Sequence, residues 1–382
     1  MTGPSRIRSI DVVRGAVMVL MAIDHVRVYS GVPPGGPTAG VFFTRWVTHF
    51  CAPAFVFLAG TSAFLHGRRL GDRGALARYL VVRGLTLVLL ELTVIRFSWT
   101  FNVAYSTFIL AGVIWMLGWC MVLLAPLVYL RTRTIAIAGI CLMLFQQLFG
   151  LVPRLLPAPI QATVAPVWNF FYPSGAPGWP GITILYVIVP WLGVMAAGYA
   201  FGAIMVRDPA GRRRLCLRIG LSATALFAML AAVTIVAVPA DGDAAPALFR
   251  ALNPSKYPVS QPFLLMTLGP MIALLPLAER ARGWAADAFL TFGRVPLFYY
   301  LLHIPLIHLT ALAVWYLRDG SPHAAWFATA PYVGIAPEQQ WGLPLLYLVF
   351  IIDVAVLYGA CRWYESRRHL RRAPAETAAA AV

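Results

Sequence analysis

Long apolar stretches recur along the whole chain and leave it few ways to fold. Hydrophobic residues make up 60% of the 382 residues and charged residues only 12%, far less charge than a soluble domain of this size needs to cover its surface. Stretches long enough to cross a bilayer as helices lie at 12–30, 47–66, 79–97, 104–130, 134–151, 182–206, 215–238, 262–279, 288–316 and 342–363. The sequence therefore predicts an all-α, polytopic integral membrane bundle of about ten transmembrane helices.

The basic residues lie unevenly on the two sides of this predicted bundle. The net charge is +16, but the basic clusters are short and lie between apolar stretches, which is typical of cytoplasmic loops and not of a nucleic-acid-binding surface. If both termini are inside, 23 of the 30 Lys and Arg residues fall in cytoplasmic segments and helix ends. We therefore predict a multi-pass protein of the inner (plasma) membrane with cytoplasmic N- and C-termini.

The remaining features indicate one domain, with the oligomeric state left open. We predict a transmembrane domain over residues 1–372 and a disordered tail over 373–382. Long non-cytoplasmic loops are rich in Pro, Gly and Trp, which indicates a lid or a binding surface. These loops lie at 31–46, 152–181, 239–261 and 317–341. The five cysteines show neither a disulfide framework nor Cys-x-x-Cys spacing, so we expect no metal site.

Two ionisable residues share one face of the first predicted helix. Arg14 and His25 are eleven residues apart, which on an α-helix amounts to three turns plus about 20° and a rise of about 16 Å. The guanidinium then lies near one membrane surface and the imidazole lies deep along the same line. Because ionisable groups are costly to bury in a bilayer, both are candidates for function. The alternative is that Arg14 only anchors the helix and His25 only bonds a neighbouring helix.

The start of the second predicted helix carries a second polar pair. Arg45 and His49 are four residues apart and therefore share a helix face. Because the first two helices are antiparallel, His49 can meet His25 in the outer part of the bundle. Asp24 is a candidate hydrogen-bond acceptor for His25, although adjacent helical residues point about 100° apart, which favours another partner for it.

The stretch 288–316 holds the other polar cluster. Its prolines predict kinks of the kind that membrane helices tolerate where they line a cavity. His303 and His308 are about 140° apart in helical phase, so at most one of them faces a shared site. The polar and proline residues of this stretch are Arg294, Pro296, Tyr299, Tyr300, His303, Pro305 and His308.

Two acidic residues lie within other predicted helices. Glu91 and Asp353 are each expected to pair with a cation, for which Arg83, Arg96 and Arg294 are candidates. As ion pairs of this kind they would be structural and not catalytic.

Several motifs of the chain resemble a known family. They are Arg8-Ser-Ile-Asp-Val-Val-Arg14-Gly15 followed by Asp24-His25, Ala52-Pro-Ala-Phe-Val-Phe-Leu-Ala-Gly60-Thr-Ser62, Asn253-Pro-Ser-Lys-Tyr-Pro258, and Gly293-Arg294-Val-Pro-Leu-Phe-Tyr-Tyr300 through His303. Together they resemble the bacterial relatives of heparan-alpha-glucosaminide N-acetyltransferase. The spacing of Arg14 and His25 is also similar to that of acyltransferase family 3. The resemblance therefore implies the transmembrane acyltransferase superfamily.

This resemblance implies transfer of an acyl group, with acetyl expected, from cytoplasmic acetyl-CoA to a glycan or another envelope acceptor outside. The implied catalytic residues are His25, Asp24 and His49. The implied donor-binding residues are Arg14, Arg45, Arg294, Tyr300 and His303.

The chain departs from the family at one point. In the lysosomal enzyme an asparagine occupies the position aligned with His25, and the catalytic histidine lies in the loop that follows. Here that loop, 30–43, holds no histidine. The catalytic base is therefore either His25 or His49.

A second class of function also fits the composition. In a proton-coupled secondary transporter or flippase, His25, Asp24, Glu91 and Asp353 would form a proton relay. The lack of a visible inverted repeat counts against a transporter, and the Arg14 and His25 pair favours the enzyme. A non-catalytic scaffold leaves the buried polar groups without a role.

Overall fold

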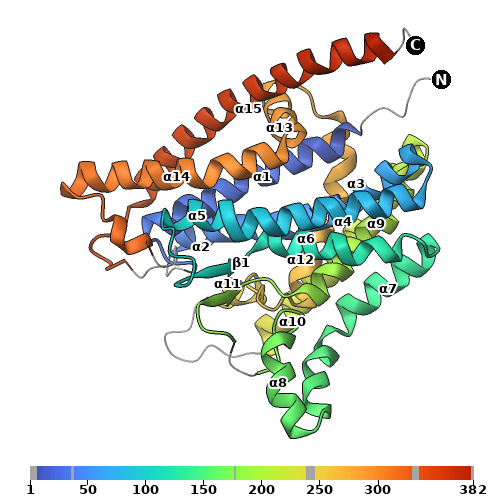
Figure 1. The fold of residues 1–382 in the computed structure, drawn as a ribbon, viewed down its shortest axis with the longest axis horizontal. Coiled ribbons are helices and arrows are strands. Elements are labelled where there is room, and N and C mark those ends of the chain that lie inside the picture. Colours follow the sequence, from blue (N-terminus) through green and yellow to red (C-terminus); the bar gives the residue numbers. More distant parts are fainter. Residues whose placement is uncertain (1–6, 36–37, 176–177, 238–245, 329–334, 380–382) are drawn as a thin grey trace. The chain divides into compact units, whose positions relative to one another are not determined.

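The computed structural model describes residues 7–35, 38–175, 178–237, 246–328 and 335–379. Within these ranges the chain is mostly helical, which confirms the predicted all-α class (Figure 1). It divides into two compact units. Unit 1 is built from Ala52–Phe97 and Phe101–Pro276, and unit 2 from Arg6–Cys51, Ser98–Thr100 and Leu277–Val382. The predicted single domain over 1–372 stays a prediction.

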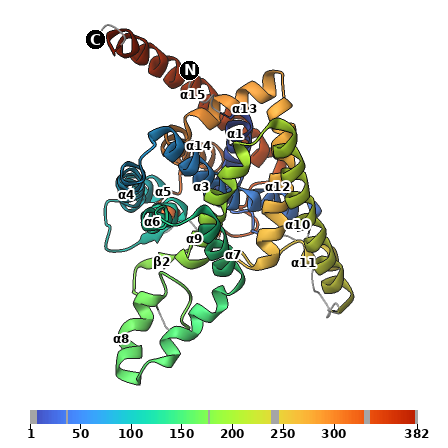
Figure 2. The same ribbon diagram turned by 90° about the vertical axis from the view of Figure 1, so that its right-hand side faces the viewer.

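Unit 1 contains the middle helices of the chain. They are α3 (Cys51–Leu70), α4 (Arg73–Leu90), the π-helix η2 (Glu91–Ile95), α6 (Val113–Leu127), α7 (Thr132–Leu144), the 3-10 helix η3 (Gln146–Leu155), α8 (Ala158–Trp168), α9 (Ile188–Met205), α10 (Pro209–Ala237), α11 (Ala247–Ala251) and α12 (Gln261–Arg280). In the short helix α5 (Arg96–Thr100), the last three residues, Ser98–Thr100, belong to unit 2. Helix α4 packs along α6, and α7 packs along α9 (Figures 1 and 2).

Small residues allow these close helix contacts. A Cβ atom on Gly84 of α4 would lie 2.5 Å from the carbonyl oxygen of Gly118 on α6, and the same holds with the two glycines exchanged. Close backbone approach at small residues is how helices associate in a bilayer, where apolar burial alone gives little driving force. The contact therefore accounts for the pairing of α4 with α6.

Unit 1 also contains a short parallel sheet that the sequence did not predict. Strand β1 (Ile109–Ala111) pairs with β2 (Ile182–Ile184), and the stretch 104–130 that was predicted as one helix is helical only from Val113. The fully buried Arg96 holds the loop before β1, because its guanidinium donates to the carbonyl oxygens of Asn102, Ala104 and Phe108. This loop is therefore ordered by one arginine.

Glu91 has a structural role different from the predicted ion pair. Its side chain is 1% exposed, and its Oε2 accepts hydrogen bonds from the backbone amides of Ile114 and Trp115 at 3.0 and 3.2 Å. These amides belong to the first turn of α6, where unpaired N–H groups favour an anion. Among the described residues, Glu91 caps α6 and pairs with no arginine, so the predicted cation partner is wrong.

Replacement of Glu91 by leucine is expected to lower the free energy of unfolding by about 2–4 kcal/mol, because two buried amides lose their acceptor. Glu91→Gln keeps a carbonyl oxygen of similar reach and should lose much less. Denaturant titration in detergent measures both variants. Equal stability of Glu91→Leu and the wild type would show that the cap contributes nothing.

Unit 2 brings the N-terminal helix together with the C-terminal ones. Its elements are α1 (Arg8–Ser30), α2 (Ala39–Trp46), the 3-10 helix η1 (Val47–Phe50), α13 (Trp284–Arg294), α14 (Pro296–Asp319), the 3-10 helix η4 (Ala324–Phe327) and α15 (Leu343–Ala379). Helix α1 packs against α13, α14 and α15. A Cβ on Gly15 would overlap the backbone of Phe289, so this glycine sets the close approach of α1 and α13.

The predicted helix over 288–316 is two helices. Helix α13 ends at Arg294, and α14 begins at Pro296 after Val295, whose backbone angles (φ −126°, ψ 49°) are not helical. The ring of a proline disfavours helical geometry in the residue before it, while proline itself suits the first position of a new helix. Pro296 therefore ends one helix and begins the next instead of kinking a single one.

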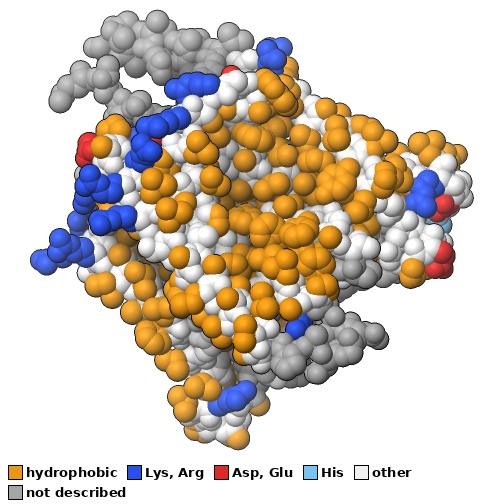
Figure 3. Space-filling view, turned by 180° about the vertical axis from the view of Figure 1, so that it is seen from behind, with side chains coloured by type: hydrophobic (Ala, Val, Ile, Leu, Met, Phe, Trp, Pro, Cys, Tyr) orange, Lys and Arg blue, Asp and Glu red, His pale blue; other side chains and the backbone are white. Residues whose placement is uncertain are grey.

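Six helices are long and apolar enough to cross a membrane, or seven if the bent pair of α7 and η3 counts as one span, within the described part of the chain. The chain is thus a polytopic membrane protein, while the predicted number of ten and the orientation stay predictions. In the apolar window of α10 only 11% of residues are buried, as expected of a helix that faces lipid. Hydrophobic side chains also cover much of the face shown in Figure 3.

The predicted loops and tail are partly structured. Helices α2, α8 and α11 and the 3-10 helix η4 lie within the four long loops, whose residues 36–37, 176–177, 239–245 and 329–334 are outside the described residues. Helix α15 continues to Ala379, and residues 380–382 of the predicted tail are also outside the description. The interpretation of these loops as a lid or a binding surface stays a prediction.

Candidate functional site

A pair of histidines from α1 and α14 forms the centre of the candidate site. The Nδ1 atom of His25 lies 2.8 Å from the Nε2 atom of His303, and the two ring planes are 27° apart. His303 is fully buried, and His25 is half-buried. Both residues were predicted to be site residues, but their contact with each other was not predicted.

Aromatic side chains surround this pair. The Trp99 ring meets His25 edge-on, with ring centroids 4.9 Å apart. Trp99 is held in place because its carbonyl oxygen accepts a 2.8 Å hydrogen bond from the Tyr29 hydroxyl on α1. His308, beyond His303 on α14, stacks on Tyr29 and bonds the carbonyl oxygen of Ser98 at 3.0 Å. The short segment Ser98–Thr100 is therefore fixed against α1 and α14.

Tyr299 and Tyr300 fix the His303 side chain from its own helix. The Nδ1 atom of His303 lies 2.7 Å from the carbonyl oxygen of Tyr300 and 3.2 Å from that of Tyr299. The Tyr299 hydroxyl donates to the carbonyl oxygen of Met18 at 2.9 Å and so joins α14 to α1. Tyr300, which was predicted to bind the donor, is buried beside the His303 ring.

Asp24 lies in a separate charged network. Its Oδ1 atom is 3.1 Å from Nε of Arg27 and 3.6 Å from Nε of Arg45. Arg45 also donates to the Thr48 hydroxyl at 2.7 Å and contacts Nδ1 of His49 at 3.3 Å, which agrees with the shared helix face predicted for Arg45 and His49. Asp24 thus faces arginines, the outcome that the helical phase favoured over a bond to its neighbour His25.

Arg14 and Arg294 lie at the beginning of α1 and at the end of α13. Arg14 contacts the Asp11 carboxylate at 3.2 Å and the carbonyl oxygen of Gly293 at 3.4 Å, and its side chain is 14% exposed. Arg294 pairs with Glu365 of α15 at 2.8 Å while 40% of its side chain stays exposed. Two predicted donor-binding arginines therefore lie where α1 meets α13.

Asp353, the other acid predicted to pair with a cation, does not do so within the described residues. Its Oδ1 atom accepts a 2.8 Å hydrogen bond from the Thr310 hydroxyl, and its Oδ2 atom is buried without a hydrogen-bond partner. The arginine partner predicted for it is therefore wrong.

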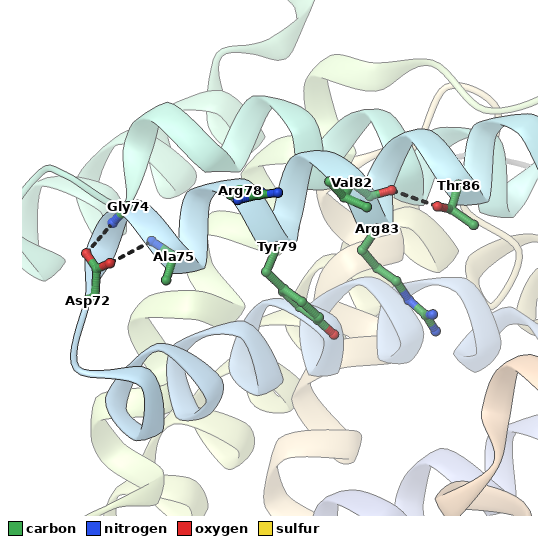
Figure 4. Close-up of a pocket in the computed structure, with 8 residues that line it drawn as sticks. All are labelled: Asp72, Gly74, Ala75, Arg78, Tyr79, Val82, Arg83 and Thr86. Carbon is green, nitrogen blue, oxygen red and sulfur yellow. Dashed lines mark hydrogen bonds between the residues drawn. The ribbon is translucent and has the colours of Figure 1, made fainter.

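An open groove of about 760 Å³ lies along α4 in unit 1. Tyr79 and Arg83 project from the same side of this helix, and Arg78 lies between them and the Asp72 cap (Figure 4). Asp72 itself accepts hydrogen bonds from the backbone amides of Gly74 and Ala75. Arg78 and Arg83 are the two arginines among the residues that line this groove.

The fold and these residues define a polytopic membrane protein with a histidine pair, one ring fully buried and the other half-buried, inside a helix bundle. Residues 6–236 match the model of the heparan-alpha-glucosaminide N-acetyltransferase catalytic domain, and the chain belongs to that family. This confirms the resemblance read from the motifs and makes the chain a member of an acetyltransferase family. No curated protein matches the chain. The match includes Arg14, Asp24, His25, Arg45 and His49 and ends before His303.

Proposed function

We propose that the protein is a transmembrane acyltransferase in which His25 activates the acceptor for attack on an acyl-CoA thioester. The observation that carries this proposal is the hydrogen-bonded pair of His25 and His303 inside the helices of an acetyltransferase-family chain. Acetyl is the proposed acyl group, because the family name specifies acetyl transfer.

The hydrogen bonds favour His25 over His49 as the base. The guanidinium of Arg45 has no acceptor atom, so its contact with Nδ1 of His49 requires that nitrogen to accept. A neutral His49 then carries its hydrogen on Nε2 and offers a donor instead of a base. His25 contacts His303 through Nδ1. Its other ring nitrogen, Nε2, can therefore act as the base.

The proposed reaction at His25 consists of proton transfers and one acyl transfer, and it needs neither a metal ion nor a redox step. The imidazole takes the proton of the acceptor hydroxyl or amine, and the acceptor atom attacks the thioester carbonyl carbon. The carbon–sulfur bond then breaks, and the proton passes from His25 to the CoA thiolate. General-base assistance of this kind contributes about 10²–10⁴ in rate. A stepwise route, with the acyl group first on His25, uses the same nitrogen as the nucleophile.

The donor binds, in this proposal, from the cytoplasmic side at the arginines where α1 meets α13. The phosphates of acetyl-CoA are anionic, and guanidinium groups hold phosphate through charge-assisted hydrogen bonds. Arg14 is eleven residues from His25 on α1, a rise of about 16 Å along the helix. The pantetheine arm would follow this helix face and deliver the thioester to the imidazole.

The acceptor side and the location are proposed from the charge distribution. A glycan or another envelope component would bind on the non-cytoplasmic side of an inner membrane protein whose termini are cytoplasmic. Sealed vesicles of both orientations test this arrangement, because acetyl-CoA does not cross a bilayer. We expect CoA release when acetyl-CoA is added to the cytoplasmic face, and release only from the opposite face would overturn the proposal.

Replacement of Arg14 by alanine is expected to weaken acetyl-CoA binding by about tenfold, the equivalent of one charge-assisted hydrogen bond of about 1.5 kcal/mol. Equilibrium binding of labelled acetyl-CoA to the purified protein measures this effect. Arg83→Ala on the α4 groove is the matched control. If Arg83→Ala weakens binding while Arg14→Ala does not, the donor binds along α4 and Arg14 only anchors its helix.

The structure gives the alternative proton relay little support. Glu91 caps α6, Asp353 bonds Thr310, and Asp24 pairs with two arginines. Each carboxylate therefore has a local structural partner in the described part of the chain. These contacts favour the acyltransferase over a proton-coupled transporter.

A further inference from the structure

The protonation state of His303 follows from its backbone contacts. Its Nδ1 atom lies within hydrogen-bond distance of two carbonyl oxygens, at 2.7 Å from Tyr300 and 3.2 Å from Tyr299. A carbonyl oxygen only accepts hydrogen bonds, so Nδ1 of His303 must carry the hydrogen. Since the ring is fully buried, a second proton would place an uncompensated charge in the core, which is costly. His303 is therefore neutral, with its lone pair on Nε2.

The state of His303 then determines that of His25. The Nε2 atom of His303 faces Nδ1 of His25 at 2.8 Å, and a hydrogen bond needs one donor between them. Because Nε2 of His303 is the acceptor, Nδ1 of His25 is the donor. The neutral His25 ring thus carries its hydrogen on Nδ1 and its lone pair on Nε2.

We propose that His303 is a positioning residue that holds His25 in the Nδ1–H tautomer, so that Nε2 of His25 takes the proton of the acceptor. This proposal rests on the proposed acyl transfer, and it replaces the donor-binding role predicted for His303. Selecting the tautomer of a catalytic histidine through its other nitrogen has a large effect on rate in hydrolase triads. Here a backbone carbonyl and a second histidine perform that selection.

The packing around His303 suits a positioning role. The ring lies against those of Tyr299 and Tyr300, with centroids 5.3 and 5.1 Å away. The hydrogen bond from the Tyr299 hydroxyl to Met18 fixes the spacing of α14 and α1 near the pair. On the other side Trp99 contacts the His25 ring edge-on. These contacts hold both imidazoles in one orientation.

Kinetics of two His303 variants test the proposal. His303→Leu removes the acceptor and should lower kcat by about 10²–10⁴-fold with little change in KM. His303→Gln places a carbonyl oxygen near the position of Nε2 and should recover a large part of kcat. His323→Leu is the control, because His323 pairs with Asp319 at the end of α14 and contacts neither His25 nor His303, so kcat should stay unchanged. In a His25→Ala background, His303→Leu should cause no further loss.

The tautomer of His25 can also be measured in the wild-type protein, so this test does not depend on whether a His303 variant folds. Nitrogen-15 NMR of labelled histidine distinguishes protonated from unprotonated ring nitrogens, and the spectrum of His25→Ala identifies the His25 signals. We expect the unprotonated nitrogen of His25 to be Nε2. An unprotonated Nδ1, or a His303→Leu enzyme with wild-type kcat, would overturn the positioning role. Full activity of His25→Ala would instead overturn the proposed function, whatever tautomer the spectrum shows.

Discussion

Replacement of His25 by alanine is expected to reduce acyl transfer by about 10²–10⁴-fold, the contribution of general-base assistance. The variant removes the imidazole that forms the hydrogen bond with His303. Acetyl-CoA affinity should stay close to that of the wild type, because the proposed phosphate contacts lie at the other end of the helix face. Stopped-flow detection of released CoA gives the rate, and equilibrium binding gives the affinity.

The control for this experiment is His323→Ala. His323 pairs with Asp319 at the end of α14, where both side chains are partly exposed, so its removal should leave the rate unchanged. A His25→Ala protein that folds, binds acetyl-CoA and transfers the acyl group at the wild-type rate would remove His25 from the mechanism. His49 would then be the remaining candidate.

Replacement of Asp24 by alanine is expected to lower the free energy of unfolding by about 3–5 kcal/mol, the usual cost of breaking a buried ion pair. The side chains of Arg27 and Arg45 are only 9% and 11% exposed, and both lose their carboxylate partner. Activity should also fall, because Arg45 would no longer be held between Asp24 and His49. Denaturant titration in detergent measures the loss of stability.

Two further variants serve as controls for this prediction: Asp24→Asn removes only the charge, and Asp319→Ala removes a more exposed ion pair. The amide side chain of the Asp24→Asn variant keeps an oxygen of the same shape without the charge, so an intermediate loss is expected. Asp319 forms a partly exposed pair with His323, and pairs at the surface contribute about 0–1 kcal/mol. If Asp24→Ala and Asp319→Ala lose the same small amount, the network around Asp24 is not a stabilising one.

The class of fold could be predicted well from the sequence, because long apolar stretches directly indicate the segments that lie in the bilayer. Each of the ten apolar stretches contains helix, and the predicted limits 262–279 agree with α12 to within one residue, whereas the stretches 104–130 and 288–316 are not single helices. The break at Val295 was missed because a proline in a long apolar stretch is compatible with either a kink or a helix start. The parallel pairing of β1 with β2 joins segments more than seventy residues apart, and short strands leave no periodic signal of that length.

The candidate site was predicted in part. Arg14 and His25, and likewise Arg45 and His49, share a helix face because of their spacing in the sequence. This is a local property, so it could be predicted. The pairing of His25 with His303 joins residues 278 positions apart and depends on how α1 packs against α14.

Other residues of the site carry no distinctive pattern in the sequence. Trp99 and Tyr29 were missed, since aromatic residues near helix ends are usual at membrane interfaces. Arginine partners were predicted for Glu91 and Asp353 because only charged residues were considered. Their actual partners are backbone amides and a threonine hydroxyl.

The role of His25 in acyl transfer is tested by a single turnover of the detergent-purified protein with acetyl-CoA that is labelled in its acetyl group, beside His25→Ala. We expect the wild-type protein to release CoA and the label to pass from the donor to an acceptor, to water or to His25 itself, with both events lost in the variant. Turnover that is equally fast without His25, or a wild-type protein that neither binds acetyl-CoA nor releases CoA, would overturn the proposed acyl transfer at His25.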